Sequence, residues 1–381
     1  MTVRIYRSTD FGAPQLSGQV GTLISVLDAC LVNGYGSNTI TSLTQSGGLA
    51  TATTNVPHQY TNKPKVLIQG AGAGEYNGEV TVTPTGPSTF TFPIAPSAPA
   101  SAGGTPTCKR AGSGWTKPFA DGTYVAAYKQ PAGSNGFYMR IDDNSTANVA
   151  RMLGYETMTD VSTGSTPFPT TAQLTGGTHV MKSDVISAVA RPWVLACNGP
   201  IMYLFISVDN NAAWVNANGY AFGDIRSYKA GGSDAYGTVI IGNNAASMSN
   251  NQFQATSNSV ATITSGHWMT RSYTGIGSAL AVGKSSDYAK AQSATTLGSN
   301  GIPYPSAVDG GLYVAPIWIH EISPTLAPRG ELPGAWNPLH ARPLATGDVW
   351  APASGPLIGK IFEAVNLYSA SQVLIETSDT W

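Results

Sequence analysis

The sequence predicts a mainly β protein with a few helices, organised as a β-sandwich or barrel-like host domain that carries a small inserted all-β module. Two features of the composition predict this β-rich α+β class. Glycine (43 residues) and proline (25 residues) interrupt the chain too often for long helices. The stretches between them are rich in Val, Ile, Thr, Tyr and Phe, which strands favour. With 381 residues, of which 42% are hydrophobic, the chain can bury the cores of two or three domains.

An amphipathic helix over residues 18–33 is expected near the start of the host domain. Apolar residues recur there at helical spacing, at Val20, Leu23, Ile24, Leu27 and Leu31. Ser17 stands where an N-terminal cap is needed, and Gly34 stands where a helix ends. The first 46 residues therefore begin the host domain with a helix.

Residues 47–108 are expected to form the inserted β-module, which divides the host domain into 1–46 and 109–322. Three short alternating runs predict its strands, at Lys65–Gln69, Glu79–Thr83 and Ser88–Phe92. Asn77–Gly78 supplies a hairpin turn between the first two runs. The Pro- and Ala-rich stretch 93–106 has no periodic pattern and predicts an extended connection.

Further apolar runs predict the strands of the host domain, at 137–141, 193–196, 201–206, 236–241 and 312–319. Residues 323–381 are predicted as a proline-rich extended arm followed by C-terminal strands, the last of them at 372–376. Prolines block helix interiors and central strands, and five of them fall between 323 and 343. The arm either wraps its own domain or crosses to a neighbouring chain.

The charge balance excludes several classes of partner. The chain has 20 Lys and Arg against 21 Asp and Glu, and its charged residues make up 11%, whereas roughly a quarter is usual. We therefore expect no nucleic-acid partner, because phosphate binding needs a basic surface. The longest apolar run, 201–206, is far below the roughly 18 residues of a membrane helix, so no membrane partner is expected. Segment 1–8 lacks the apolar core of a secretory signal.

Cysteine and histidine usage predicts neither disulfides nor a metal site. Three widely spaced cysteines fit free thiols in a reducing cytosol, and the five histidines lack metal-ligand spacing. The glycine-rich stretch 70–74 follows a strand, but a turn and another strand come next instead of the helix that a dinucleotide loop requires. No cofactor is therefore expected.

Catalytic groups are sparse. The carboxylates considered as a glycosidase pair are Asp142, Asp143, Glu156 and Asp160. Segment 142–146 is also suited to a loop held by side-chain to backbone hydrogen bonds, which is the preferred interpretation. Gly231–Ala235 lacks the final glycine of a GxSxG nucleophile motif and is better read as a turn. We expect no catalytic residues and no enzyme.

Three of the eight tryptophans are candidates for contacts between subunits. Trp115, Trp336 and Trp381 lie in irregular segments flanked by Gly or Pro, or at the chain end. Aromatic residues are enriched at the centres of interfaces. With so few surface charges, the chain is expected to complete its burial against other copies of itself.

The host chain resembles a family of tailed-bacteriophage virion structural proteins. The resemblance covers most of the host chain and lies in Ile5–Asp10, Leu16–Gln19, Leu27–Gly36, Gly114–Phe119, Asn135–Asp143, Arg151–Asp160, Phe222–Tyr228, Arg329–Trp336 and Glu376–Trp381. The insert is similar to small β-modules of phage tail proteins, through Lys65–Gly70, Glu75–Gly78 and Ser88–Phe92.

This resemblance implies a non-enzymatic structural protein of the phage tail, baseplate or neck, assembled in the bacterial cytoplasm and localised in the virion. Its implied partners are other copies of itself, in a symmetric homo-oligomer, and other virion proteins. An alternative is a module that decorates the particle or binds a host-surface glycan through Tyr60, Tyr76, Phe90 and Phe92, although these aromatics suit the core of the insert equally well. A glycan-degrading enzyme is the remaining alternative.

Overall fold

The chain is mainly β in the computed structural model, with 47% of residues in strands and 5% in helix, and its antiparallel sheets curl into half-barrels. This confirms the predicted β-rich fold class. The structure describes residues 3–61, 63–211, 213–231, 234–248, 253, 266–285, 304–321, 327–340, 342–368, 371–378 and 381.

The main body contains a thirteen-stranded sheet. Its order is β1 (Arg4–Arg7), β16 (Trp193–Cys197), β17 (Ile201–Ser207), β18 (Ala217–Asp224), β20 (Thr238–Ile241), β21 (His267–Met269), β22 (Leu280–Ser285), β23 (Val314–Glu321), β24 (Ala327–Pro338), β27 (Gln372–Glu376), β26 (Phe362–Asn366) and β25 (Val349–Trp350), with β19 (Arg226–Ser227) paired to β24. The predicted host runs at 193–196, 201–206, 236–241, 312–319 and 372–376 lie in this sheet. All of its pairings are antiparallel.

A five-stranded sheet packs beside it. The order is β15 (Thr178–Met181), β12 (Val149–Tyr155), β11 (Tyr138–Thr146), β10 (Val125–Lys129) and β9 (Thr116–Asp121), and β13 (Thr157–Met158) pairs with β14 (Gly164–Ser165). One core lies between this sheet, the helix and one face of β16 and β17, and a second core covers the other face of these strands. Both faces of β17 are therefore buried, which explains why 201–206 is continuously apolar.

The N-terminal helix is shorter than predicted. Helix α1 spans Thr22–Leu27 and continues as a π-helix over Asp28–Asn33, which Gly34 ends with φ of 71°. Ser17 does not cap it. Instead, the Leu23 amide donates to Asp143 Oδ2 at 2.9 Å. A cap supplied from a strand 120 residues away lets the helix begin at 22 instead of 18.

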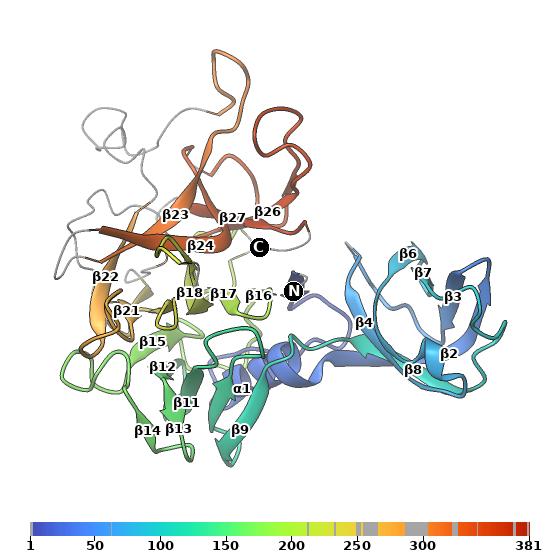
Figure 1. The fold of residues 1–381 in the computed structure, drawn as a ribbon, viewed down its shortest axis with the longest axis horizontal. Coiled ribbons are helices and arrows are strands. Elements are labelled where there is room, and N and C mark those ends of the chain that lie inside the picture. Colours follow the sequence, from blue (N-terminus) through green and yellow to red (C-terminus); the bar gives the residue numbers. More distant parts are fainter. Residues whose placement is uncertain are drawn as a thin grey trace.

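Residues 35–110 form a second β-body with its own core, at the right of Figure 1. Its seven strands run in the order β5 (Gly78–Thr81), β4 (Lys65–Ala71), β8 (Gly104–Arg110), β2 (Tyr35–Ser46), β3 (Leu49–Thr54), β7 (Thr89–Pro93) and β6 (Thr83–Gly86). We call this body the module. It begins at 35 instead of 47 because β2 pairs with both β8 and β3.

The proline-rich segment pairs within its own sheet and is not an extended arm. Strand β24 covers 327–338 and pairs with β23 and β27, while residues 323–326 lie outside the described residues. The pairing of β23 with β24 shifts register between Pro316 and Trp318. Pro333 and Gly334 fall in the resulting bulge, where no ladder hydrogen bond is required of them.

Candidate anion-binding cleft

The carboxylates considered as catalytic acids have structural partners. Asp143 is fully buried, forms an ion pair with Lys182 and accepts the Leu23 amide. Burial raises the pKa of Asp143, and burial likewise lowers the pKa of Lys182. A buried pair of this kind holds the helix start against β11 and leaves no acid free for proton transfer.

The other three acids do not form a pair with it. Glu156 accepts Nε and Nη2 of Arg271 at 2.6 and 2.9 Å. Burial acts to raise the Glu156 pKa, but the hydrogen bonds from Arg271 and Thr270 bring it below its usual value. Asp160 is exposed and accepts amides of its own turn. Asp142 lines a cavity of about 300 Å³ that none of the other three acids lines.

The tryptophans offered as contacts between subunits each contact residues of their own chain. Trp115 is 2% exposed and donates from Nε1 to the Gly199 carbonyl, so it has no surface for a neighbour. Trp381 donates to the Glu376 carbonyl and packs against Tyr203. Trp336 is half-buried. All eight tryptophans are described, and none is exposed, because the sheets of the main body already cover them.

The module's aromatic residues form its own core. Phe90 and Tyr76 are 0% exposed, Phe92 is 1% exposed and Tyr60 is 7% exposed. A sugar-stacking platform needs an exposed ring face, which none of these four offers. The interpretation of these residues as core is therefore confirmed.

Other candidate motifs have structural explanations. The stretch 70–74 leads into a 3₁₀ turn at Gly74–Tyr76, and the Asn77 side chain closes the loop by bonding both the amide and the carbonyl of Ala71. Among the described residues there is no cluster of metal-ligating side chains. No described helix is long and apolar enough to cross a membrane. Ser233 lies outside the described residues.

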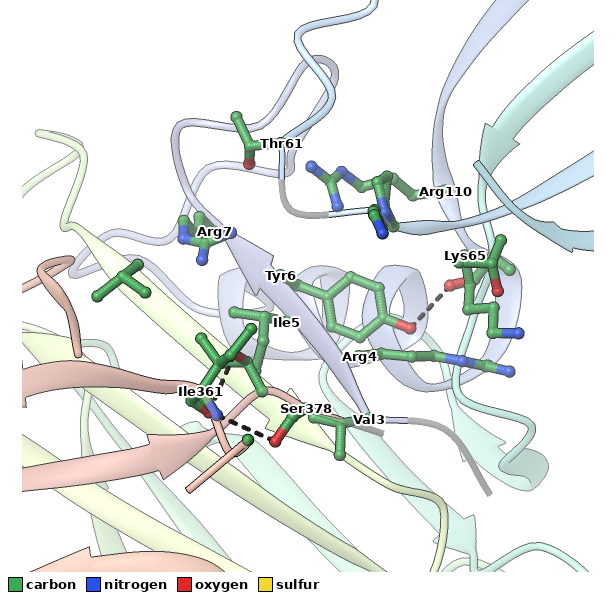
Figure 2. Close-up of a pocket in the computed structure, with 17 residues that line it drawn as sticks. Val3, Arg4, Ile5, Tyr6, Arg7, Thr61, Lys65, Arg110, Ile361 and Ser378 are labelled. Carbon is green, nitrogen blue, oxygen red and sulfur yellow. Dashed lines mark hydrogen bonds between the residues drawn. The ribbon is translucent and has the colours of Figure 1, made fainter. Parts of the chain in front are cut away.

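A cleft of about 590 Å³ lies between the module and the main body. Three distant parts of the chain meet there: strand β1, the module around residues 61–65 and its end at 110–111, and C-terminal segments around 359–361 and 377–378. Figure 2 shows β1 crossing the floor, with Lys65 and Arg110 on the module side and Ile361 and Ser378 on the opposite side.

The cleft concentrates positive charge. Five of the chain's 20 Lys and Arg line it, and no Asp or Glu among the described residues does so; the five are Arg4, Arg7, Lys63, Lys65 and Arg110. Three of them form ion pairs with carboxylates that do not line the cleft. Arg4 pairs with Glu79, Arg7 with Glu363 and Arg110 with Asp10. Neither lysine forms an ion pair with a described residue. The cleft therefore keeps an excess of positive charge.

Arg4 adds unsatisfied donors to this wall. Its Nη2 donates to Glu79 at 2.6 Å, but its Nε and Nη1 are buried without a hydrogen-bond partner in the described chain. Buried polar groups are normally paired, and an unpaired one is costly. Because both atoms are buried, these donors are not presented to a ligand in the cleft.

The floor of the cleft is a free strand edge. Strand β1 is the terminal strand of its sheet and pairs only with β16. The Ser8 amide donates to Trp193, and the Arg7 amide donates away from β16 to Asp10. Hydrogen-bonding direction alternates along an antiparallel strand, so the N–H and C=O of Ile5 also point away from β16, toward the cleft.

Sequence reasoning missed this cleft because its cations come from positions 4 to 110 and meet only in the folded chain. A partial signal exists in the first strand, where Arg4 and Arg7 flank apolar residues. The scan against protein-family models and the search of curated proteins found no match for this chain.

Proposed function

We propose that this chain is a non-enzymatic structural component of a tailed-phage particle, in its tail, baseplate or neck. The observation that carries the proposal is the convergence of three segments that resemble the phage family. Within 222–228 and 329–336, Arg226 lies opposite Glu331 in the β19–β24 pair. The third segment, 376–381, brings the Trp381 ring against Gly334. These segments lie together in one region of the main body, which supports the proposal.

The state of the carboxylates supports a role without catalysis. A glycosidase needs two acids on either side of one cleft. Here Asp143 is committed to Lys182 and Glu156 to Arg271, while Asp160 is held in its own turn. Asp142 lines a cavity that none of the other three acids lines, so no two of the four acids flank one described cavity.

The module supports a role as an appendage of the particle. It stands at one side of the main body in Figure 1, and its aromatics are used for its own core. Its strands β3 and β6 expose threonines, such as Thr51 and Thr85. A polar surface with few charges favours contact with neighbouring proteins in an assembly over steering of charged ligands.

An exposed apolar segment supplies a surface for assembly. Val185, Ile186 and Val189 are 51%, 66% and 56% exposed. Clustered apolar residues of this kind mark contact sites on otherwise polar proteins. In this proposal the segment packs against another copy of the chain or against a neighbouring virion protein.

Mass spectrometry of purified particles tests the proposal. We expect peptides from this chain at a stoichiometry of several copies per particle. Particles that lack the chain would refute membership of the virion. Turnover of capsule or peptidoglycan by the isolated protein, abolished by Asp142→Asn, would instead show an enzyme.

A further inference from the structure

We propose that the cleft between the module and the main body binds an extended acidic segment of another protein by strand addition to β1. The inference goes beyond the proposed function and does not depend on it. It rests on two observations that point to the same occupant, namely a free strand edge and an excess of cations beside it.

The strand edge specifies a peptide. A residue added beside β1 can pair its backbone N–H and C=O with those of Ile5, which point outward, as in other complexes formed by strand addition. The four residues of β1 span roughly 13 Å at about 3.3 Å per residue. A glycan offers no regular row of donors and acceptors at this spacing.

The two walls of the cleft specify the side chains of that peptide. Alternate residues of β1 face opposite sides: Arg4 bonds to Glu79 of the module and Tyr6 bonds to Ala111 just beyond it, whereas Arg7 bonds to Glu363 of β26. Side chains of an added strand alternate in the same way. One set of them would face the cations of the module, and the other would face the apolar residues of the C-terminal wall.

The charges select acidic residues for the first set. Lys63 is exposed and Lys65 is half-buried, and neither pairs with a described carboxylate. The opposite wall exposes Val349 and Ile361, at 55% and 42%. The occupant is therefore an extended segment in which acidic and apolar residues alternate.

A fluorescence-polarisation titration of the full-length chain tests this inference. The probe is the labelled peptide Asp-Val-Asp-Val-Asp-Val, and the comparison peptides are Lys-Val-Lys-Val-Lys-Val and the first peptide with N-methyl groups on alternate amides. We expect the acidic peptide to bind, the basic one to fail and the N-methylated one to bind at least about tenfold more weakly, because it cannot pair with β1.

Charge reversal locates the site. The double variant Lys63→Glu and Lys65→Glu is expected to weaken binding of the acidic peptide by about tenfold or more. Lys229→Glu is the matched control, since Lys229 is exposed and does not line the cleft, and we expect a change below about twofold. Far-UV circular dichroism confirms that each variant is folded.

Three results would overturn the inference. The acidic peptide fails to bind at millimolar concentration, the N-methylated peptide binds equally well, or the double variant matches Lys229→Glu. An acidic-glycan site would instead be identified by three results together. Polygalacturonate competes with the peptide, its binding is lost in the double variant, and the N-methylated peptide still binds. Each of these outcomes leaves membership of the particle to be decided by mass spectrometry.

Discussion

Arg4 and Glu79 join the edge strands of two different sheets, with Arg4 Nη2 2.6 Å from Glu79 Oε1. Glu79 is 36% exposed, so this pair contributes only about 0–1 kcal/mol. A buried pair, Arg110 with Asp10 at 2.8 Å, and the hydrogen bond from Tyr6 to the Ala111 carbonyl lie close to it. Breaking the buried Arg110–Asp10 pair would therefore cost more than breaking the Arg4–Glu79 pair.

Replacing Asp143 tests whether this acid is structural. Asp143→Asn leaves Lys182 buried without its carboxylate partner, although its bond to the Gln19 carbonyl remains. Loss of one charge costs about 3–5 kcal/mol in other buried pairs. We expect a loss of that order in the free energy of unfolding, measured by urea denaturation. Asp121→Asn is the control, since Asp121 is exposed, and its effect should stay within about 0.5 kcal/mol. Equal stability of the two variants would contradict the structural role.

Gly334 is a site where a side chain would meet Trp381. A Cβ at this position would lie 2.2 Å from the Trp381 Nε1 atom, and Gly334 has φ of 68°. We expect Gly334→Ala to destabilise the chain by about 2–4 kcal/mol, from strain and overpacking together. Gly347→Ala separates the two effects, because Gly347 has φ of 90° with open space around it. It should lose only about 1 kcal/mol; thermal unfolding that ranks the two variants in reverse would disprove the packing argument.

The module is expected to be removable. Tyr35 and Arg110 lie opposite each other in the β2–β8 pair, so the chain enters and leaves the module at neighbouring positions. A variant that replaces 38–107 by Asn-Gly, a hairpin turn sequence, should keep the main body folded. Circular dichroism and cooperative thermal unfolding check this. Loss of the transition would show that the main body needs the module to fold.

Deleting the module also separates attachment from assembly. Phage that carry the 38–107 replacement should still assemble if the module is an appendage. Lost adsorption by intact particles would support binding of a host-surface glycan, and unchanged adsorption would remove that alternative. A deletion of 47–108 is less suitable, because it leaves β2 without its partners β3 and β8.

Lys284 predicts a pH dependence of stability. Burial lowers the pKa of Lys284 from 10.5 to about 7, and its Nζ donates to the Phe253 carbonyl at 2.7 Å. Between pH 7 and pH 10.5 the folded chain binds fewer protons than the unfolded chain. The free energy of unfolding should therefore rise with pH by up to about 1.4 kcal/mol per pH unit. Urea denaturation at pH 7.5 and 8.5 measures this slope. Lys284→Met should lower the slope by about that amount, and an unchanged slope would show that Lys284 is not its source.

The strands were predictable because their signals are local. Alternating apolar residues at 65–69 and 88–92, and the continuous run at 201–206, each coincide with a strand. Such patterns depend on neighbours within a few residues, which the sequence displays directly. The fold class followed from them.

The remaining features depend on contacts between distant residues. The helix start is fixed by Asp143, and Pro333 is tolerated because a bulge in the β23–β24 pair accommodates it. Neither partner is visible in the local pattern. The cleft is the extreme case, since its cations come from two sheets and its free edge exists only because β1 ends one of them.

A cryo-EM map of the intact particle tests the central claim most directly, because it shows whether the chain belongs to the particle and what lies against β1. The account predicts several symmetry-related copies, each with an extended segment of a neighbouring protein running along Val3–Arg7. Particles without this chain would contradict the structural role. Copies whose β1 edge faces only solvent would contradict the assignment of the cleft.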